Sequence, residues 1–479
     1  NGVKLIDRML GQLAKLGLSK TVLVIGYQGQ KLRNYVGASV NGMQIEYIDN
    51  PIYDKTNNIY SLALASNELL KNDTLLLESD LIFEDAVLQK IMNDRHPNVA
   101  CVDAFKSWMD GTVVTLGEDN SIKQFIPKRE FVYAEIPSYY KTVNIYKFSR
   151  EFSVSHYVPF LKAYSQALGN NEYYEQVLRV IALIDKPVMF ALPLSGEKWY
   201  EIDDLQDLDI AESMFCAPQE QIKKLSSRYG GYWRYPGLKD FCYLVNPYYP
   251  SKRLRAEMMQ SFDELLDAYP SGIKVNSLLA AKTFGLHQNQ ILVGNGASEL
   301  IKAFMEMTEG KIGFVYPTFD EYPNRISEDR RVIFTPPTPG FRYTAEDLTG
   351  FFKDKGLSTF VLVNPDNPSG NMLSESEVTE LAAWAYRNKI RLLVDESFID
   401  FADQPYTCLK QGFLQKYPTV CVIKSISKSY GVPGIRLGVF ASNDAVLIAA
   451  MKEAVAIWNI NSFGEFFLQI CEKYHDEYA

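Results

Sequence analysis

Apolar positions in the first half of the chain alternate between helical spacing and short continuous runs. Residues 3–17 carry apolar side chains at the spacing of a helix packed on one face, and residues 21–25 form an apolar run that ends at a glycine. Further strand-like runs occupy residues 44–48, 74–78, 100–102, 112–116, 143–146 and 188–192. Helical patterns separate several of these runs. The pattern therefore predicts an α/β domain with a largely parallel sheet, whose ligand site lies beyond the carboxyl ends of the strands.

The second half shows the same alternation, with clearer boundaries between the segments. Strand-like runs occupy residues 291–293, 361–363, 391–394 and 419–423, and helices are predicted up to residue 307, at 375–388 and near 443–457. Ser374 and Glu377 have the spacing of a capping box. Residues 217–239 have the pattern of a polar helix followed by a linker with glycine and tyrosine. We therefore expect two α/β domains, 1–216 and 240–479, joined by the linker 217–239.

Length and composition agree with a two-domain globular protein. A chain of 479 residues exceeds what one hydrophobic core normally serves. The net charge of −9 argues against nonspecific binding to nucleic acid or to an anionic membrane. The sequence contains neither an apolar run of the roughly 20 residues that a membrane span needs nor a recognisable signal peptide. We therefore expect a cytoplasmic protein that binds neither nucleic acid nor membranes.

Cysteine and histidine spacing gives little reason to expect a metal site of the zinc type. The six cysteines lack C-x-x-C spacing, and most lie in apolar segments, so they are predicted to be reduced thiols. The four histidines are far from one another in the sequence. No zinc site is therefore predicted.

Lys428 carries the clearest chemical signal. It follows the run at 419–423, where serine, glycine and proline residues end the strand and open a loop. A lysine near an apolar strand end can lose its proton by desolvation and become the amine that condenses with an aldehyde, usually pyridoxal phosphate (PLP). Ser425, Ser427 and Arg436 can hold a phosphate, the arginine with two parallel hydrogen bonds. The alternative is a solvated loop between two strands.

The pattern S-x-S-K-x-x-G-x-x-G-x-R-x-G at 425–438 resembles the lysine segment of fold-type I, class I/II aminotransferases. The resemblance is greatest to the group of histidinol-phosphate aminotransferases and threonine-phosphate decarboxylases. It implies a three-layer α/β/α large domain in which Lys428 binds PLP covalently.

Three further segments resemble motifs of the same family, in the same order. Glycines and the first helical turn at Gly296, Ala297 and Ser298 can cradle a phosphate, although such a turn is often only a tight connection. The Asn-Pro-x-Asn-Pro-Ser-Gly box implies that Asn367 bonds the phenolic oxygen of PLP. Asp395, at a strand end, would pair with the pyridinium nitrogen; the alternative is a helix cap.

Three aromatic positions extend the resemblance. Phe319 would stack on the pyridine ring, the alternative being an aromatic turn in the core. Tyr269, in a Tyr-Pro-Ser-Gly segment, corresponds to a tyrosine that reaches the PLP phosphate of the neighbouring subunit, which implies a homodimer. Phe398 stands where many relatives have a tyrosine that also contacts the phenolic oxygen.

In the first half, Asp80 and Asp203 follow strand-like segments. Magnesium favours one or two carboxylates together with substrate phosphates, so a pair of aspartates at strand ends suits a nucleotide site. The alternative for each aspartate is a helix cap.

The order of several polar segments resembles the phosphocholine cytidylyltransferase branch of the sugar-nucleotide pyrophosphorylases. These segments are Asn57-Asn58-Ile59-Tyr60, Glu78-Ser79-Asp80, Asp110-Gly111-Thr112, Glu172-Tyr173-Tyr174-Glu175 and Glu201-Ile202-Asp203. The resemblance implies a Rossmann-like nucleotidyltransferase domain that uses CTP, with Mg²⁺ at Asp80 and Asp203 and with Asn58 near the nucleotide or the acceptor. Tyr173, Tyr174 and Glu175 can surround an ammonium group, since aromatic faces and a carboxylate both attract cations.

The ends of the chain depart from both family patterns. The nucleotidyltransferase pattern includes a glycine-rich triphosphate loop upstream of the first helix, and the aminotransferase pattern includes a C-terminal small domain with an arginine for the substrate carboxylate. Neither is found between Asn1 and Ala479. We therefore expect a fragment of a longer protein that binds CTP weakly.

Together these segments predict a bifunctional enzyme. A PLP-dependent aminotransferase acting on a small, phosphorylated amino or keto substrate would be fused to a CTP-dependent nucleotidyltransferase that activates an amino-alcohol phosphate. Two alternatives remain open: a PLP-dependent decarboxylase of a phosphorylated hydroxy-amino acid with the same fusion, and a PLP-binding regulatory module without turnover. The sequence shows no helix-turn-helix with a basic surface, which counts against a fused transcription factor.

Overall fold

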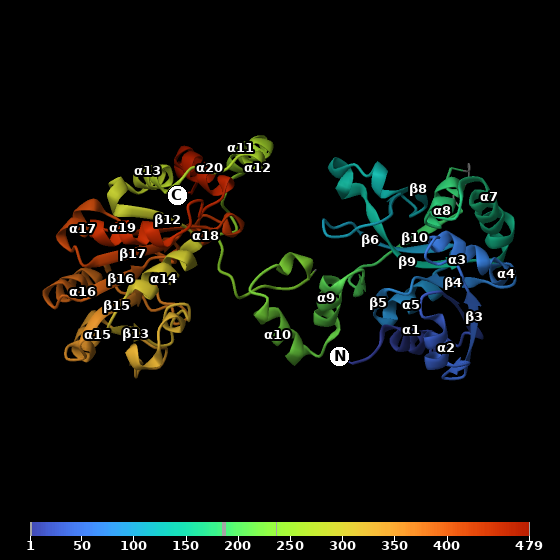
Figure 1. Ribbon diagram of the computed structural model, residues 1–479, viewed down its shortest axis with the longest axis horizontal. Helices are drawn as coiled ribbons and strands as arrows, with labels where there is room; N and C mark the ends of the chain where they lie inside the picture. The colour runs from blue at the N-terminus through green and yellow to red at the C-terminus, as the bar shows by residue number, and fades with distance from the viewer. Residues whose placement is uncertain (1, 184–187, 236, 479) are drawn as a thin grey trace. The chain divides into compact units, whose positions relative to one another are not determined.

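The computed structural model describes residues 2–183, 188–235 and 237–478, which fall into two compact units. Unit 1 is Asn1–Asp240 and unit 2 is Phe241–Ala479, coloured blue to green and green to red in Figure 1. Each unit has its own sheets and its own buried apolar clusters. None of the helices in the described part of the chain is long and apolar enough to cross a membrane.

The described residues of unit 1 form three sheets. A three-stranded sheet has the order β1-β3-β2, a six-stranded sheet has the order β10-β6-β9-β7-β8 with β4 added beside β9, and β11 pairs with β5. The strands are β1 (Lys20–Ile25), β2 (Ser39–Val40), β3 (Met43–Asp49), β4 (Thr74–Leu77), β5 (Leu81–Phe83), β6 (Val99–Ala104), β7 (Val113–Leu116), β8 (Ile122–Ile126), β9 (Tyr140–Phe148), β10 (Phe190–Pro193) and β11 (Trp199–Glu201). The helices are α1 (Leu5–Ala14), α2 (Gly29–Val36), α3 (Asn58–Leu64), α4 (Ser66–Leu69), α5 (Asp85–Asn93), α6 (Arg150–Phe152), α7 (Val158–Leu168), α8 (Glu175–Ile181), α9 (Leu205–Phe215) and α10 (Pro218–Ser227).

The prediction of a largely parallel sheet is wrong for the six-stranded sheet. β9 pairs antiparallel with β4, β6 and β7, and β7 pairs antiparallel with β8, whereas β10 and β6 are parallel. The apolar pattern of the sequence explains why strand direction was not predicted correctly. A continuous apolar run identifies a strand that is buried on both faces, but it carries no information about the direction of its partner.

Residues 217–239, predicted as a linker, are grouped with unit 1. Their first part forms α10, as the polar helical pattern predicts, and a short 3₁₀ helix follows at Tyr232–Arg234. Tyr235 is buried in an apolar cluster with Ile210 and Met214 of α9. This apolar burial explains why the segment packs against unit 1 instead of running free.

Unit 2 is built around one seven-stranded sheet of order β12-β18-β17-β16-β15-β13-β14. Its strands are β12 (Ile291–Asn295), β13 (Lys311–Val315), β14 (Arg331–Phe334), β15 (Leu357–Val363), β16 (Arg391–Asp395), β17 (Val420–Ser425) and β18 (Leu437–Ser442). The pairs from β14 to β17 are parallel, and β18 runs antiparallel to β17 and β12. The helices are α11 (Lys252–Gln260), α12 (Phe262–Asp267), α13 (Ile273–Phe284), α14 (Gly296–Met307), α15 (Ala345–Phe352), α16 (Glu375–Arg387), α17 (Gln411–Lys416), α18 (Ile426–Ser429), α19 (Ala445–Ala454), α20 (Ser462–Ile470) and α21 (His475–Tyr478).

Helices cover both faces of this sheet. Consecutive sheet residues alternate between two buried clusters: Leu392 and Val422 belong to one, and Leu393 and Ile423 to the other. The first cluster includes apolar residues of α13, α15, α16 and α20, and the second includes those of α14 and α19. The two-residue period of a strand thus gives each helical layer its own core. The three-layer α/β/α arrangement predicted for this half is confirmed, as is the capping box of α16 formed by Ser374 and Glu377.

Candidate functional site

The candidate site of unit 2 lies where β12, β16, β17 and β18 meet the loops and helices that follow or precede them. Asp395 is the last residue of β16, Ser425 is the last of β17, and Lys428 lies on the short helix α18 directly after it. β16 and β17 are parallel neighbours, so their carboxyl ends lie together. Residues distant in sequence are thereby brought to one edge of the sheet.

Lys428 lies between aromatic rings in a partly buried position. Its Nζ is 3.9 Å from the centroid of the Phe398 ring and 5.8 Å from that of Phe319. Burial lowers the pKa of the Lys428 amine, and the negative charge of Asp395 acts in the opposite direction. Because burial is the larger effect, the amine reaches its neutral, nucleophilic form at lower pH than an exposed lysine.

Asp395 is buried and held by two donors. The Tyr322 hydroxyl donates to its Oδ2 at 2.7 Å, and the Ser397 amide donates to its Oδ1 at 2.9 Å. Two donors on one carboxylate stabilise its negative charge and fix its orientation. The arrangement suits the predicted role of Asp395, which is to keep a proton on a ring nitrogen.

An anion cradle forms where β12 leads into α14. The Gly296 amide donates to the Arg436 carbonyl at 2.9 Å, and Arg436 Nη2 donates to Ser298 Oγ at 3.0 Å. Gly296 has a φ of 73°, and a Cβ placed on it would lie 2.7 Å from Arg436 Nη2. Gly296, Ala297 and Ser298 form the first turn of the 12-residue helix α14, whose dipole favours an anion at this end. The predicted phosphate residues at 296–298 therefore lie beside Arg436.

The two serines before Lys428 are in different surroundings. The Ser427 hydroxyl donates to the Leu437 carbonyl and accepts from the Leu437 amide, both at 3.2 Å, so it ties α18 to β18. Ser425 is buried, and its amide donates to Ser397 Oγ at 3.0 Å. The Ser427 hydroxyl, predicted to hold a phosphate, therefore has two hydrogen bonds to the backbone of Leu437.

The remaining predicted residues of unit 2 surround the same edge. Asn367 lies in the loop after β15, and the Asn364 amide of this loop donates to the Asp395 carbonyl at 2.9 Å. Tyr269 is 80% exposed and packs on Trp458 with a centroid distance of 4.7 Å. Tyr269 also lines a surface pocket with Asn295, the residue directly before the cradle.

These features fit PLP. Lys428 supplies the neutral amine that the aldehyde needs, and Asp395 supplies the buried carboxylate that the pyridinium nitrogen needs. The cradle with Arg436 supplies the helix N-terminus and the arginine that suit the phosphate.

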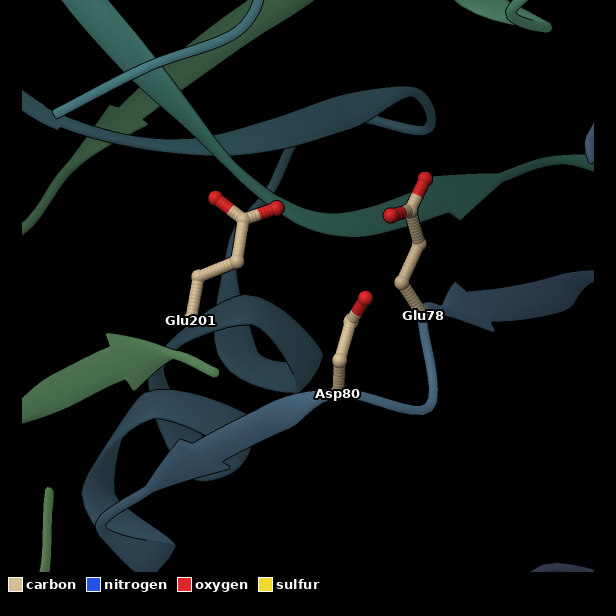
Figure 2. Close-up of side chains that lie close together, drawn as sticks. All are labelled: Glu78, Asp80 and Glu201. Carbon is tan, nitrogen blue, oxygen red and sulfur yellow. The ribbon is translucent and has the colours of Figure 1, made fainter. Parts of the chain in front are cut away.

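Unit 1 contains a cluster of carboxylates. Glu78 follows β4, Asp80 precedes β5, and Glu201 ends β11, and one oxygen from each lies within 4.8 Å of the others (Figure 2). Asp80 was predicted from the sequence, whereas Glu78 and Glu201 were not assigned a role. The signal for them was present, since each stands two residues before a predicted aspartate.

Asp203 lies at the exposed rim of this cluster rather than within it. Burial raises the pKa of the Asp80 carboxyl, and the charge of Asp203 raises it further, so the two aspartates still face each other electrostatically. Asp80 Oδ1 is buried without a hydrogen-bond partner. An orphaned carboxylate oxygen among other carboxylates is the donor set that a hard divalent cation prefers.

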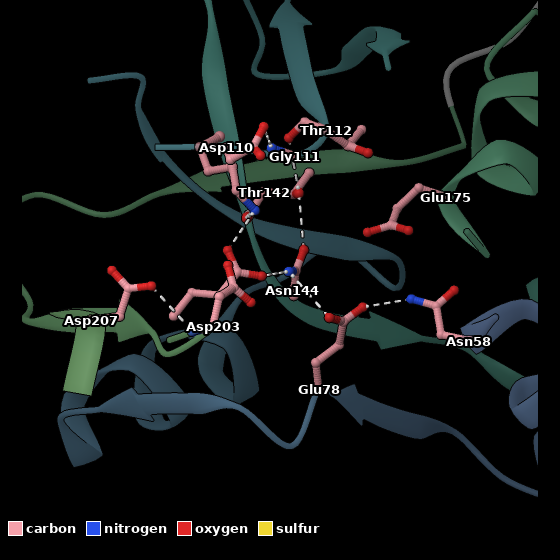
Figure 3. Close-up of polar contacts among 12 residues, drawn as sticks. Asn58, Glu78, Asp110, Gly111, Thr112, Thr142, Asn144, Glu175, Asp203 and Asp207 are labelled. Atoms are coloured by element: carbon pink, nitrogen blue, oxygen red, sulfur yellow. Dashed lines mark hydrogen bonds and ion pairs between the residues drawn. The ribbon is translucent and has the colours of Figure 1, made fainter. Parts of the chain in front are cut away.

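Lys141 and Asn144 of β9 hold the cluster together, and Figure 3 shows Asn144 beside Glu78. The Lys141 side chain is 2% exposed, and its Nζ lies 3.2 Å from Glu201 Oε2. Asn144 Nδ2 donates to Glu201 Oε1 at 2.8 Å and to Glu78 Oε2 at 3.4 Å. Burial raises the pKa of Glu78 to about 8, with the charges of Glu175 and Asp80 acting in the same direction. One buried ammonium thus faces an excess of carboxylates.

The residues predicted to surround an ammonium group are split. Asn58 Nδ2 donates to Glu78 Oε1 at 3.1 Å, and its Oδ1 accepts from the Tyr174 amide at 2.9 Å. Tyr174 and Glu175 are buried, and Glu175 Oε1 accepts from the Tyr146 hydroxyl at 3.3 Å. Tyr173 is exposed. The structure therefore places Asn58, Tyr174 and Glu175 beside the carboxylate cluster and leaves Tyr173 on the surface.

Comparison with known proteins gives matches over both units. Residues 254–468 match the family described as aminotransferase class I and II. The whole chain is 32% identical to CMP-5'-(3-aminopropyl)phosphonate synthase of Streptomyces rubellomurinus, of which it covers 76%. Over 48% of the chain it is 33% identical to L-serine phosphate decarboxylase of Sulfurospirillum multivorans, of which it covers 61%. A solved structure of a decarboxylase from the same organism is 31% identical over 50% of the chain and 63% of its own length, with a TM-score of 0.45.

Proposed function

The second unit of the chain belongs to the class I and II aminotransferase family, and we propose that it binds PLP and transforms a small amino acid that carries a phosphate or phosphonate group. One observation carries this proposal: the Lys428 amine, the anchored Asp395 carboxylate and the cradle beside Arg436 lie at one edge of one sheet. The alternative of a solvated Lys/Ser loop does not account for the partial burial of Lys428 or for the buried Asp395 carboxylate with its two hydrogen-bond donors.

Each residue of unit 2 has a defined task in this proposal. When bound, PLP supplies an aldehyde and an electron-withdrawing ring that stabilises negative charge on the substrate carbon next to nitrogen. Lys428 provides the attacking amine and then moves a proton to or from that carbon. Asp395 holds a proton at the ring nitrogen, and Asn367 orients the ring through its phenolic oxygen. Ser298 and Arg436 grip the phosphate, and Ser425 adds a hydroxyl to this set.

Decarboxylation is the reaction that we propose first. Support comes from the two relatives: one is named an L-serine phosphate decarboxylase, and the other is named for an aminopropylphosphonate, an amine without a carboxylate. Transamination is the second candidate, supported by the family description. Loss of carbon dioxide in the first reaction and of a proton in the second each leave negative charge on the substrate carbon next to nitrogen, so the residues above serve either.

For unit 1 we propose nucleotidyl transfer from CTP to an aminoalkyl phosphate or phosphonate. Similarity over the whole chain to a synthase of a CMP derivative supports this, as does the carboxylate cluster with its orphaned Asp80 oxygen. Asp80, Glu201 and Asp203 would hold Mg²⁺, which when bound neutralises charge on substrate phosphates. Asn144, which donates to both Glu78 and Glu201, would orient these two carboxylates.

We also propose a homodimer with shared sites. The exposed Tyr269 is available to reach the phosphate cradle of a second copy, as the family resemblance implies. Molar mass in solution, measured by light scattering, tests the assembly, and a monomer would contradict it.

Product analysis tests the proposed reaction of unit 2. The full chain, loaded with PLP, is incubated with O-phospho-L-serine, and carbon dioxide and keto acid are measured separately. We expect carbon dioxide from the wild type and none from Lys428→Ala. Lys410→Ala is the matched control, because Lys410 is an exposed lysine directly before α17. Keto acid without carbon dioxide would indicate transamination. If neither product forms although PLP is bound, the regulatory module without turnover becomes the better account.

Nucleotidyl transfer is tested separately. Chains with Asp80→Asn or the matched control Glu118→Gln, which lies in an exposed loop, are incubated with CTP, Mg²⁺ and 3-aminopropylphosphonate. We expect release of pyrophosphate from the wild type and the control but not from Asp80→Asn. Equal release from all three would contradict the proposal for unit 1.

A further inference from the structure

A cavity of about 750 Å³ opens in unit 1 on the side of Glu201 and Asp203. Its size is that of a pocket for a small organic ligand. Lys141, Glu201 and Asp203 line one side, and the indole and phenol rings of Trp108, Trp199, Tyr200 and Tyr235 contribute apolar surface. A further part of the wall comes from the segment after α9, through residues that include Gln221 and Arg234. A stretch predicted from the sequence as a linker thus lines a ligand-sized cavity.

This wall is fastened to the body of unit 1 by several contacts. Lys224 of α10 forms an ion pair with Glu212 of α9 at 2.7 Å, and Gln221 Nε2 donates to the Ser213 carbonyl at 3.0 Å. The Arg228 guanidinium lies 5.4 Å from the centroid of the buried Tyr235 ring. Ion pairs, a side-chain hydrogen bond and apolar burial therefore fix the segment that carries Arg234.

Apart from Asp203, the carboxylates that line the cavity already have partners. Asp103 accepts from Trp199 Nε1 at 2.9 Å, Asp110 pairs with Lys128 at 2.6 Å, and Glu197 pairs with Lys90 at 2.8 Å. Asp204 accepts from two amides at the start of α9, and Asp207 accepts from the Tyr200 hydroxyl at 3.2 Å. Glu201 pairs with Lys141. Most of the negative charge in the lining is therefore neutralised or hydrogen-bonded within the protein.

Three cations that line the cavity lack this kind of pairing within the described part of the chain. Within the described part of the chain, neither Lys106, Lys198 nor Arg234 forms an ion pair with a carboxylate. Lys106 has only the Trp108 ring, 5.5 Å from its Nζ. Arg234 Nη2 donates to the Gln206 side chain at 3.0 Å when that amide presents its oxygen. Three cations without anionic partners around one cavity leave a place for a ligand that carries at least two negative charges.

We propose that Lys106, Lys198 and Arg234 bind the phosphate or phosphonate group of a small-molecule ligand in this cavity. Arg234 offers a planar pair of donors to two oxygens of the group, and the lysines add point charges. The segment of unit 1 that follows α9 is therefore part of the binding site and not a spacer. The inference deepens the proposal of nucleotidyl transfer and rests on it only for the identity of the ligand.

Two sources can supply such a group: the polyphosphate of a nucleotide and the phosphonate of the acceptor. Calorimetric titration distinguishes them, with inorganic pyrophosphate as the probe for the first and 3-aminopropylphosphonate for the second. The full chain is used in the presence of Mg²⁺ and saturating PLP, so that the phosphate cradle of unit 2 is filled. Lys106→Ala, Lys198→Ala, Arg234→Ala and Arg234→Lys are compared with the wild type. Lys223→Ala is the matched control, because Lys223 is an exposed lysine of α10 outside the cavity lining.

We expect the dissociation constant of at least one probe to rise roughly tenfold in each alanine variant, as for the loss of one charge-assisted hydrogen bond. Arg234→Lys should recover part of the affinity, and Lys223→Ala should match the wild type. Loss of affinity for pyrophosphate alone assigns the site to the nucleotide, and loss for the phosphonate alone assigns it to the acceptor.

A second readout protects the test against variants that fold poorly. Trp233 is next to Arg234 and is exposed, so its fluorescence should change when a probe binds, and Trp233→Phe should remove that change. Lys198 is exposed, so Lys198→Ala removes a charge without removing buried contacts.

The outcomes separate this inference from the proposal for unit 1. If the variants weaken binding but no CMP is transferred, the anion site stands and nucleotidyl transfer fails. If CMP is transferred but the alanine variants bind both probes like Lys223→Ala, the inference is overturned and nucleotidyl transfer stands. Failure of the wild type to bind either probe would also overturn the inference.

Discussion

The Tyr322 hydroxyl donates a hydrogen bond of 2.7 Å to Asp395 Oδ2, and both side chains are buried. Tyr322 lies in the segment after β13, and β13 is two strands away from β16 in the sheet. The bond therefore joins two segments of the candidate site that follow different strands. The Asp395 charge in turn acts on the Lys428 amine. Tyr322 is therefore a positioning residue, because it acts on the ring nitrogen of PLP only through Asp395.

Replacing Tyr322 by phenylalanine should weaken PLP binding. The Asp395 carboxylate would keep only the Ser397 amide as a donor, and an unsatisfied buried acceptor costs about 1–3 kcal/mol. We expect the dissociation constant of PLP to rise by about one order of magnitude and the absorption maximum of the bound cofactor to shift. Spectrophotometric titration measures both. Tyr386→Phe, a change at a half-exposed tyrosine of α16, is the control, and equal titrations for the two variants would refute the role of Tyr322.

Adding a methyl group at Gly296 should disrupt the anion cradle. Its Cβ would lie 2.7 Å from Arg436 Nη2, and its φ of 73° is strained for any side chain. Gly340→Ala is a matched control, because Gly340 has a φ of 78° but open space around the added methyl group. We expect Gly296→Ala to abolish measurable PLP binding while Gly340→Ala keeps it. If both variants bind PLP equally well, the cradle is not the phosphate site.

The carboxylate cluster of unit 1 should make stability depend on pH. The pKa of Glu78 is about 8 in the folded chain, above its ordinary value of 4.5, mainly because of burial. The folded state therefore binds the Glu78 proton more tightly than the unfolded state, and stability falls as pH rises from 4.5 to about 8. Hydrogen exchange of β9 at pH 5, 7 and 9 measures the local free energy of opening.

In Glu78→Gln the part of this pH dependence due to Glu78 should disappear, whereas Glu118→Gln in an exposed loop should keep it. A wild type whose β9 exchange is equally protected at pH 5 and 9, after correction for intrinsic exchange rates, would contradict the burial of an ionisable cluster.

Much of the site in unit 2 could be predicted because its residues lie at strand ends. Asp395 and Lys428 follow consecutive parallel strands, so the strand pattern alone places them at one edge. The Gly296 turn precedes a long amphipathic helix and could likewise be located. The bond between Tyr322 and Asp395 was not foreseen, because it joins residues 73 positions apart through a loop without a regular pattern.

Unit 1 was harder to predict for two physical reasons. Apolar runs do not reveal strand direction, so the antiparallel pairing of β9 was missed. The carboxylate cluster depends on β4, β5 and β11 coming together, and only the pairing of β5 with β11 brings Glu201 beside Asp80. The polar composition of residues 217–239 predicts a linker and does not reveal that the buried Tyr235 anchors the segment to α9.

Borohydride reduction of the PLP-loaded chain, followed by peptide mapping, tests the central claim most directly. Reduction makes the bond between PLP and its lysine permanent, so the modified residue can be identified by mass spectrometry. We expect the label on Lys428 in the wild type and no label in Lys428→Ala. A label on another lysine, or none on a wild-type chain that has been exposed to PLP, would contradict the account.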